Sequence, residues 1–123
     1  MDRDTDLFVQ AFWVRCRETI RPELDSTVDG LKGKGHDAHV ATQEYSEVPD
    51  QLPDAGPSLT LTVHPNGEPK GHTLQFRGDV AQSDVVVTTS AGKSSRHELD
   101  ALELPVVKAE ISAFLTALLG AHA

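Results

Sequence analysis

The sequence has few cysteines and aromatic residues and no long hydrophobic run. Its one cysteine, Cys16, cannot form a disulfide within the chain, so we expect a reducing, cytoplasmic setting. The longest uncharged run, 111–121, is about half of the roughly 20 residues that a membrane-spanning helix needs. The first residues, MDRDTD, lack the basic and apolar regions of a signal peptide. We therefore expect neither export nor a membrane partner.

Basic residues are also few. Eleven Lys and Arg stand against nineteen Asp and Glu, which gives a formal net charge of -8. Because this charge repels phosphate backbones, we expect no nucleic-acid partner. The stretch AGKSS at 91–95 has the last residues of a phosphate-binding loop, but Val87 stands where that motif requires glycine. We expect a plain loop there and no cofactor.

What the sequence does contain is enough apolar material for one globular domain spanning residues 1–123, of which 38% are hydrophobic. The longest element is a predicted helix over Leu7–Leu31. Pro22 lies inside it, but the apolar spacing passes through without a change of phase, which predicts a kinked, continuous helix. Spacings of four and three predict one face that covers a sheet, formed by Val9, Trp13, Cys16, Ile20, Leu24, Thr27 and Leu31.

A second group of apolar residues lies on another side of the same helix: Leu7, Phe8, Ala11 and Phe12. One neighbour cannot bury both sides, so this group predicts a second neighbour. That neighbour is the C-terminal helix, a second copy of the chain or a different protein.

Alternation of apolar and polar residues predicts strands at 37–48, 58–64 and 72–78, and a β-branched run predicts a fourth strand at 83–90. A short helical turn is predicted within 97–104. A helix from Pro105 to Gly120 follows, with a main face of Val107, Ile111, Phe114, Leu115 and Leu118 and a smooth second face of Ala109, Ala113 and Ala117. The predicted fold is a two-layer α-β-β-β-β-α domain of the α+β class, with a four-stranded antiparallel meander and both terminal helices packed on one face.

Chemical motifs are weak. Among six histidines, His36, His39 and His64 are candidate metal ligands, with His72 an alternative third, but no typical ligand spacing supports them. Ser94, Ser95, His97 and Asp100 are close in sequence, yet closeness in a loop does not build a catalytic triad. Cys16 lies on the apolar stripe of the first helix, where a buried thiol is expected to be inert.

The outward face of the predicted sheet is polar, with Tyr45 and Arg77 as candidate anchors for a partner. We therefore expect a non-enzymatic protein-binding domain, such as an adaptor, chaperone-like or immunity-type protein, which self-associates as a homodimer through its terminal helices. The alternative is a small-ligand or metal-binding protein that uses histidines near the first strand and the central hairpin.

Overall fold

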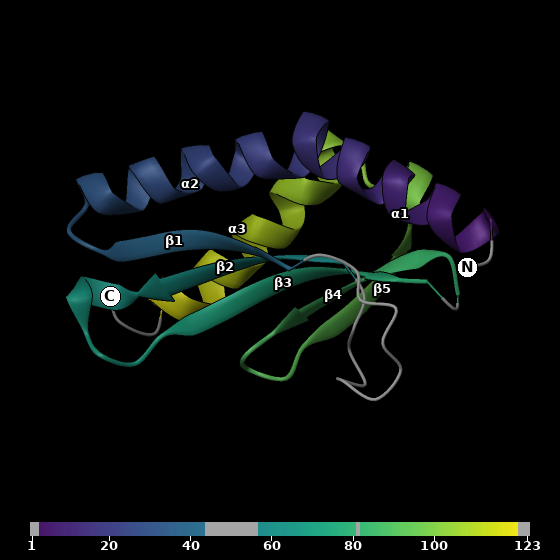
Figure 1. The fold of residues 1–123 in the computed structure, drawn as a ribbon. Helices are drawn as coiled ribbons and strands as arrows, with labels where there is room; N and C mark the ends of the chain where they lie inside the picture. Colours follow the sequence, from purple (N-terminus) through teal and green to yellow (C-terminus); the bar gives the residue numbers. More distant parts are fainter. Residues whose placement is uncertain (1–2, 44–56, 81, 121–123) are drawn as a thin grey trace.

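The computed structural model describes residues 3–43, 57–80 and 82–120, and its order of helices and strands confirms the α+β class (Figure 1). Tyr45, predicted as a partner anchor, lies outside the described residues. The helical elements are α1 (Arg3–Arg15), a π-helical turn η1 (Cys16–Ile20), α2 (Arg21–Gly33), the short 3-10 turns η2 (Pro65–Gly67) and η3 (Leu99–Ala101), and α3 (Leu104–Gly120). The strands are β1 (Asp37–Gln43), β2 (Ser58–His64), β3 (His72–Asp79), β4 (Asp84–Thr89) and β5 (Ser94–Glu98).

The sheet is an antiparallel meander with strand order β1-β2-β3-β4-β5. The prediction of four strands was therefore wrong by one. The missed strand, β5, has the sequence SSRHE and contains no apolar residue, so it carries no alternation of apolar and polar side chains. Only the exposure of its side chains alternates: Ser95 and His97 are half-buried, and their neighbours are exposed. The short helical turn predicted within 97–104 is confirmed as η3, although the first two residues of that range, His97 and Glu98, belong to β5.

The first helix continues through Pro22, as predicted, and Figure 1 shows its axis bending between α2 and α1. The π-helical turn η1 ends two residues before the proline, and the N–H of Arg21 donates to the carbonyl of Cys16, five residues earlier. A proline lacks the N–H for a helical bond, and its ring clashes with the carbonyl four residues before it, here that of Glu18. The wider π-helical turn removes this conflict without ending the helix.

The face of this helix that covers the sheet differs from the predicted one. Val9, Trp13 and Thr27 are only half-buried, whereas the buried side chains are Phe8, Phe12, Cys16, Ile20, Leu24, Val28 and Leu31. Most of these recur every four residues, a spacing that drifts around an α-helix of 3.6 residues per turn. The π-helical turn, which is wider than an α-helical one, offsets part of that drift. Its position cannot be seen in the apolar pattern, which is why the predicted face was wrong at Val9 and Trp13, before the turn, whereas the predicted Cys16, Ile20, Leu24 and Leu31 are buried.

Phe8 and Phe12 are buried because α1 lies very close to β3. A Cβ atom on Gly78 would lie 3.2 Å from the ring of each phenylalanine and 3.1 Å from Pro57. The two rings therefore pack directly over the backbone of Gly78, and a side chain on this residue would keep them away. The apolar character of Phe8 and Phe12 is thus explained within this chain.

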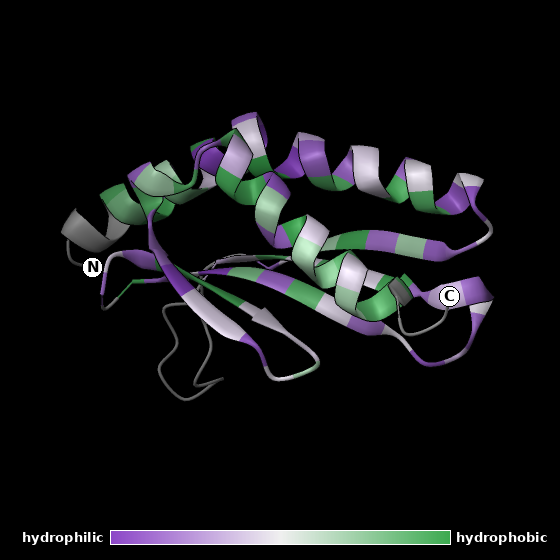
Figure 2. Ribbon diagram, turned by 180° about the vertical axis from the view of Figure 1, so that it is seen from behind, coloured by the Kyte–Doolittle hydropathy of each residue, from purple (hydrophilic) through white to green (hydrophobic). Residues whose placement is uncertain are grey.

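The C-terminal helix α3 covers the rest of the same sheet face, and Figure 2 shows it crossing the sheet on the side of α1 and α2. Val107, Ile111, Phe114 and Leu118 of its predicted main face are buried. All four belong to one cluster with the buried residues of the long helix and of the inner sheet face. Among the described helices, none combines the length and the apolar character needed to cross a membrane.

The close packing at Gly78 predicts opposite effects for one substitution at two glycines. Gly78→Ala is expected to lower the free energy of unfolding by about 1–3 kcal/mol, because the new methyl group must displace two rings and Pro57. Gly30→Ala is the control: nothing lies within 4 Å of a Cβ there, and alanine in a helix interior should add about 0.5–1 kcal/mol. Urea unfolding followed by circular dichroism measures both. A Gly78→Ala protein as stable as the parent would contradict this packing.

Candidate functional site

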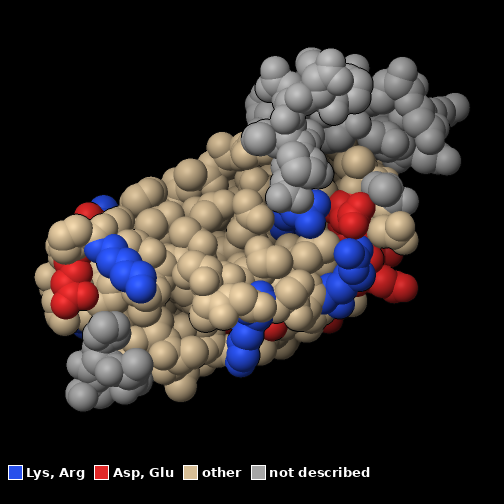
Figure 3. Space-filling model, turned by 90° about the horizontal axis from the view of Figure 1, so that it is seen from below, with Lys and Arg blue, Asp and Glu red and all other residues tan. Residues whose placement is uncertain are grey.

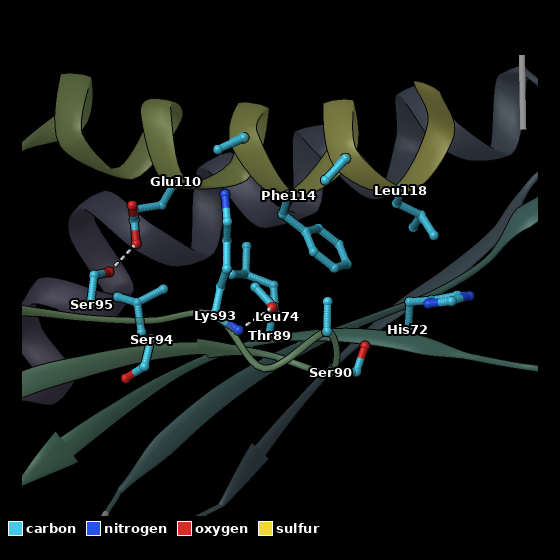
Figure 4. Close-up of a pocket in the computed structure, with 14 residues that line it drawn as sticks. His72, Leu74, Thr89, Ser90, Lys93, Ser94, Ser95, Glu110, Phe114 and Leu118 are labelled. Atoms are coloured by element: carbon cyan, nitrogen blue, oxygen red, sulfur yellow. Dashed lines mark hydrogen bonds between the residues drawn. The ribbon is translucent and has the colours of Figure 1, made fainter. Parts of the chain in front are cut away.

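A cleft of about 660 Å³ lies between α3 and the inner face of strands β3 to β5. We call it the α3 cleft (Figure 4). Its walls are formed mainly by apolar and small side chains, with a few polar groups at the ends. The lining residues are His72, Leu74, Val87, Thr89, Ser90, Ala91, Lys93, Ser94, Ser95, Glu110, Ala113, Phe114, Ala117 and Leu118.

The sheet register explains which strand residues face this cleft. Leu74 pairs with Thr89, and Val87 pairs with Ser95, so these side chains share the inner face. On the opposite wall, Glu110, Phe114 and Leu118 follow one another at intervals of four along α3 and turn the same way. Between these larger residues the helix presents Ala113 and Ala117, and the facing strands present serine and threonine. These short side chains do not fill the space between the two layers.

One end of the cleft is closed by a polar contact between β5 and α3. The hydroxyl of Ser95 donates to Oε2 of Glu110 at 2.7 Å (Figure 4). Nε2 of His97 lies 3.7 Å from the same carboxylate oxygen and 3.5 Å from the Ser95 hydroxyl. All three side chains are partly buried. A protonated His97 forms an ion pair with Glu110 in this arrangement.

Ser95, His97 and Glu110 are the residue types of a catalytic triad, but the hydrogen bonds between them do not follow the order of a triad. In a triad the serine hydroxyl donates to one imidazole nitrogen, while the carboxylate holds the other nitrogen. Here the Ser95 proton goes to the carboxylate, and Nε2 of His97 faces both partners. Ser94 is exposed, and Asp100 is exposed on η3, so neither joins the group. The arrangement holds a strand to a helix.

The β4–β5 turn forms the edge of the cleft and carries Lys93. The Ser90 N–H donates to the Thr73 carbonyl at 3.0 Å, and the Thr73 N–H donates to the Ser90 hydroxyl at 3.0 Å. These two bonds fix the turn against β3. Figure 4 shows the Lys93 side chain extending from the turn toward α3. Within the described parts of the chain, no carboxylate forms an ion pair with Lys93.

The residues predicted to bind a partner do not form one surface. Leu7 and Ala11 are exposed on α1, whereas Phe8 and Phe12 are in the core. Arg77 points to the outer face of the sheet, where it pairs in register with Val86, and it is half-buried. Partner binding through Leu7, Ala11 and Arg77 stays a prediction.

The three candidate metal ligands are only partly brought together. The rings of His39 and His64 stack with centroids 6.3 Å apart. His36 is occupied elsewhere, because its Nδ1 accepts the N–H of Asn66 at 2.9 Å, and Nδ1 of His64 donates to the carbonyl of Glu68 at 3.0 Å. In the described ranges, no three His, Cys, Asp or Glu side chains are grouped so as to hold a metal ion.

The outer face of the sheet is broad and largely uncharged. Figure 3 shows few Lys, Arg, Asp or Glu side chains over its centre, with most of them toward the margins. At one margin, Nη1 of Arg96 contacts Asp84 at 2.6 Å and Asp79 at 3.1 Å. These hydrogen bonds and charges raise the pKa of the Arg96 guanidinium, so it stays protonated and links β5 to β4 and β3.

Cys16 lies in the core, as predicted, with only 2% of its surface exposed. Burial raises the pKa of its thiol from 9.0 to about 12, because the thiolate would lose its hydration there. The reactive thiolate form is therefore suppressed at neutral pH, and Cys16 takes no part in the candidate site.

Comparison with protein-family models, with curated proteins and with solved structures finds no match to this chain. No residue role can be transferred from another protein. The function of the α3 cleft must follow from the side chains that form it.

The buried thiol leads to a labelling prediction. In the folded protein at about pH 8, Cys16 should react with Ellman's reagent at least about a hundredfold more slowly than in urea, because both burial and the raised pKa suppress the thiolate. Absorbance of the released thiolate measures both rates. The same chain in urea is its own control, since the unfolded thiol regains an ordinary pKa. Rapid stoichiometric labelling of the folded protein would contradict the packing of Cys16.

Proposed function

We propose that this chain is a non-enzymatic binding domain that takes a small, largely apolar molecule into the α3 cleft. The observation that carries this proposal is the cleft itself. Its volume of about 660 Å³ lies within the range of roughly 300–1,000 Å³ that is usual for small-molecule sites. Such sites combine apolar walls with a few polar groups that orient the ligand.

The walls support an apolar ligand. Leu74, Val87, Phe114 and Leu118 line the cleft and also belong to the hydrophobic core. Because these four side chains are already buried, the apolar surface that a ligand removes from water includes that of the exposed Ala113 and Ala117, at roughly 25 cal/mol for each Å². Ala113 and Ala117 let the ligand approach the backbone of α3, because their side chains end at Cβ.

The polar contact at the end of the cleft supports binding rather than catalysis. The Ser95 hydroxyl already donates to Glu110, and the carboxylate stabilises the serine as a neutral donor. A carboxylate is a weaker base than the imidazole that activates the serine of a triad, and here the imidazole of His97 does not hold the Ser95 proton. We also propose a cytoplasmic setting, which the single cysteine supports, because it has no disulfide partner in this chain.

Filling the cleft tests this function. Ala117→Trp places a large side chain into the α3 cleft and should reduce the affinity for decanol by roughly tenfold or more, since the ligand and the indole compete for one space. Ala109→Trp is the matched control, because Ala109 is exposed on the same helix but does not line the cleft. Isothermal titration calorimetry measures both affinities. The proposal fails if the parent protein does not bind decanol, or if both variants bind it equally well.

A second candidate function is self-association or binding of a protein partner through α1. Leu7, Ala11 and Val14 are spaced by four and three, so they share one face of the helix. Leu7 is 53% exposed and Val14 is 41% exposed, which is high for large apolar residues. This exposed stripe replaces the predicted group of Leu7, Phe8, Ala11 and Phe12, because Phe8 and Phe12 are buried in the core. A symmetric dimer would bury the stripe against its own copy.

Adding a charge to the stripe tests self-association. Val14→Glu should shift the parent dimer to a monomer at micromolar concentration, because a dimer would bury an unpaired carboxylate at its interface. Ser26→Glu, at an exposed position of α2, adds the same charge away from the stripe and should leave the dimer intact. Sedimentation equilibrium gives the mass of each protein. A parent protein that sediments as a monomer would rule out the dimer.

A further inference from the structure

We propose that the ligand of the α3 cleft is a medium-chain fatty carboxylate, with its carboxylate on Lys93 and its alkyl chain between α3 and the sheet. This inference rests on the proposed function, since it assigns a ligand class to the same cleft. It adds a head group and an orientation to the apolar site.

The charges around the cleft select the head group. Lys93 is the one Lys or Arg among the lining residues, and its side chain extends toward α3 (Figure 4). Its ammonium forms no ion pair within the described parts of the chain, so its three N–H donors are available. The flexible stem of a lysine can lie along an apolar surface while its charge stays in water. Lys93 is thus suited to hold an anion at the mouth of an apolar site.

Glu110 restricts where that anion can lie. Its carboxylate is held at the β5 end of the cleft by the Ser95 hydroxyl at 2.7 Å. An anionic head group placed there would meet a like charge, whereas beside Lys93 it meets an opposite one. A ligand with several phosphates would face one lysine and a chain of net charge -8. A single carboxylate fits this balance better than a nucleotide does.

The shape of the cleft selects the tail. The lining residues of α3 run from Glu110 to Leu118, which at 1.5 Å per residue spans about 12 Å of helix. Along this length the apolar contacts come from Phe114 and Leu118 on the helix and from Leu74 on the sheet. Apolar walls along this length suit an unbranched alkyl chain. Decanoate has a chain of comparable length and one negative charge.

The experiment compares three ligands with one tail and different heads: decanoate, decanol and decylamine. Calorimetry with the parent protein should give the highest affinity for decanoate and the lowest for decylamine. Lys93→Ala should weaken decanoate binding roughly three- to fivefold, the size expected for a solvent-exposed ion pair, and leave decanol unchanged. Lys93→Gln, which keeps a polar side chain without the charge, should show the same loss. Lys108→Ala, which removes a lysine of α3 outside the cleft, should change neither affinity.

Raising the salt concentration should weaken decanoate binding to the parent protein but not to Lys93→Ala, because salt screens the ion pair. Equal affinities for decanoate and decanol, or an unchanged affinity in both Lys93 variants, would overturn the carboxylate assignment and leave the apolar cleft standing. Tightest binding of decylamine would also overturn it and identify Glu110 as the partner of the head group. If the parent protein does not bind decanol, the proposed function itself fails.

Discussion

One-sided burial of the sheet is the constraint on which the structure depends. Strands β2 to β4 carry apolar side chains on their inner face, which helices must cover, whereas the side chains of the outer face are mostly half-buried, apart from the buried Ser58 and Val86. The long N-terminal helix covers it closely, down to the contact of two phenylalanine rings with Gly78. The shorter α3 presents alanine between its larger residues and leaves a cleft. The proposed ligand site is the part of the inner face where the covering layer is incomplete.

Much of the fold could be predicted from the sequence because the signals are local. The strands around Leu61 and Phe76 follow from alternation, the strand around Val86 from its β-branched run, and the helix after Pro105 from helical spacing, and each segment shows its signal by itself. The strand Ser94–Glu98 could not be predicted, because its pairing depends on β4 rather than on apolar residues of its own. The α3 cleft depends on how two layers meet. Its only signal was Ala113 and Ala117 beside Phe114 and Leu118, which did not indicate a cavity.

Polar contacts replace the hydrophobic core at the β5 edge of the sheet. On the inner side, Ser95 is bonded to Glu110, and on the outer side Arg96 contacts Asp79 and Asp84. An edge strand with polar side chains and charges is also a poor template for pairing with another chain. The same contacts therefore hold β5 in place, close one end of the cleft and protect the sheet edge.

The contact of Phe8 and Phe12 with Gly78 also affects the order of events during synthesis. Phe8 and Phe12 are synthesised early, but Gly78, over which their rings pack, is added only after more than half of the chain has been made. Domains fold as their parts leave the ribosome, and apolar surface exposed before then can associate with other chains. The nascent helix must keep its apolar face uncovered until the β2–β3 hairpin has emerged. During the interval between these two points the nascent chain exposes the apolar face that Gly78 later covers.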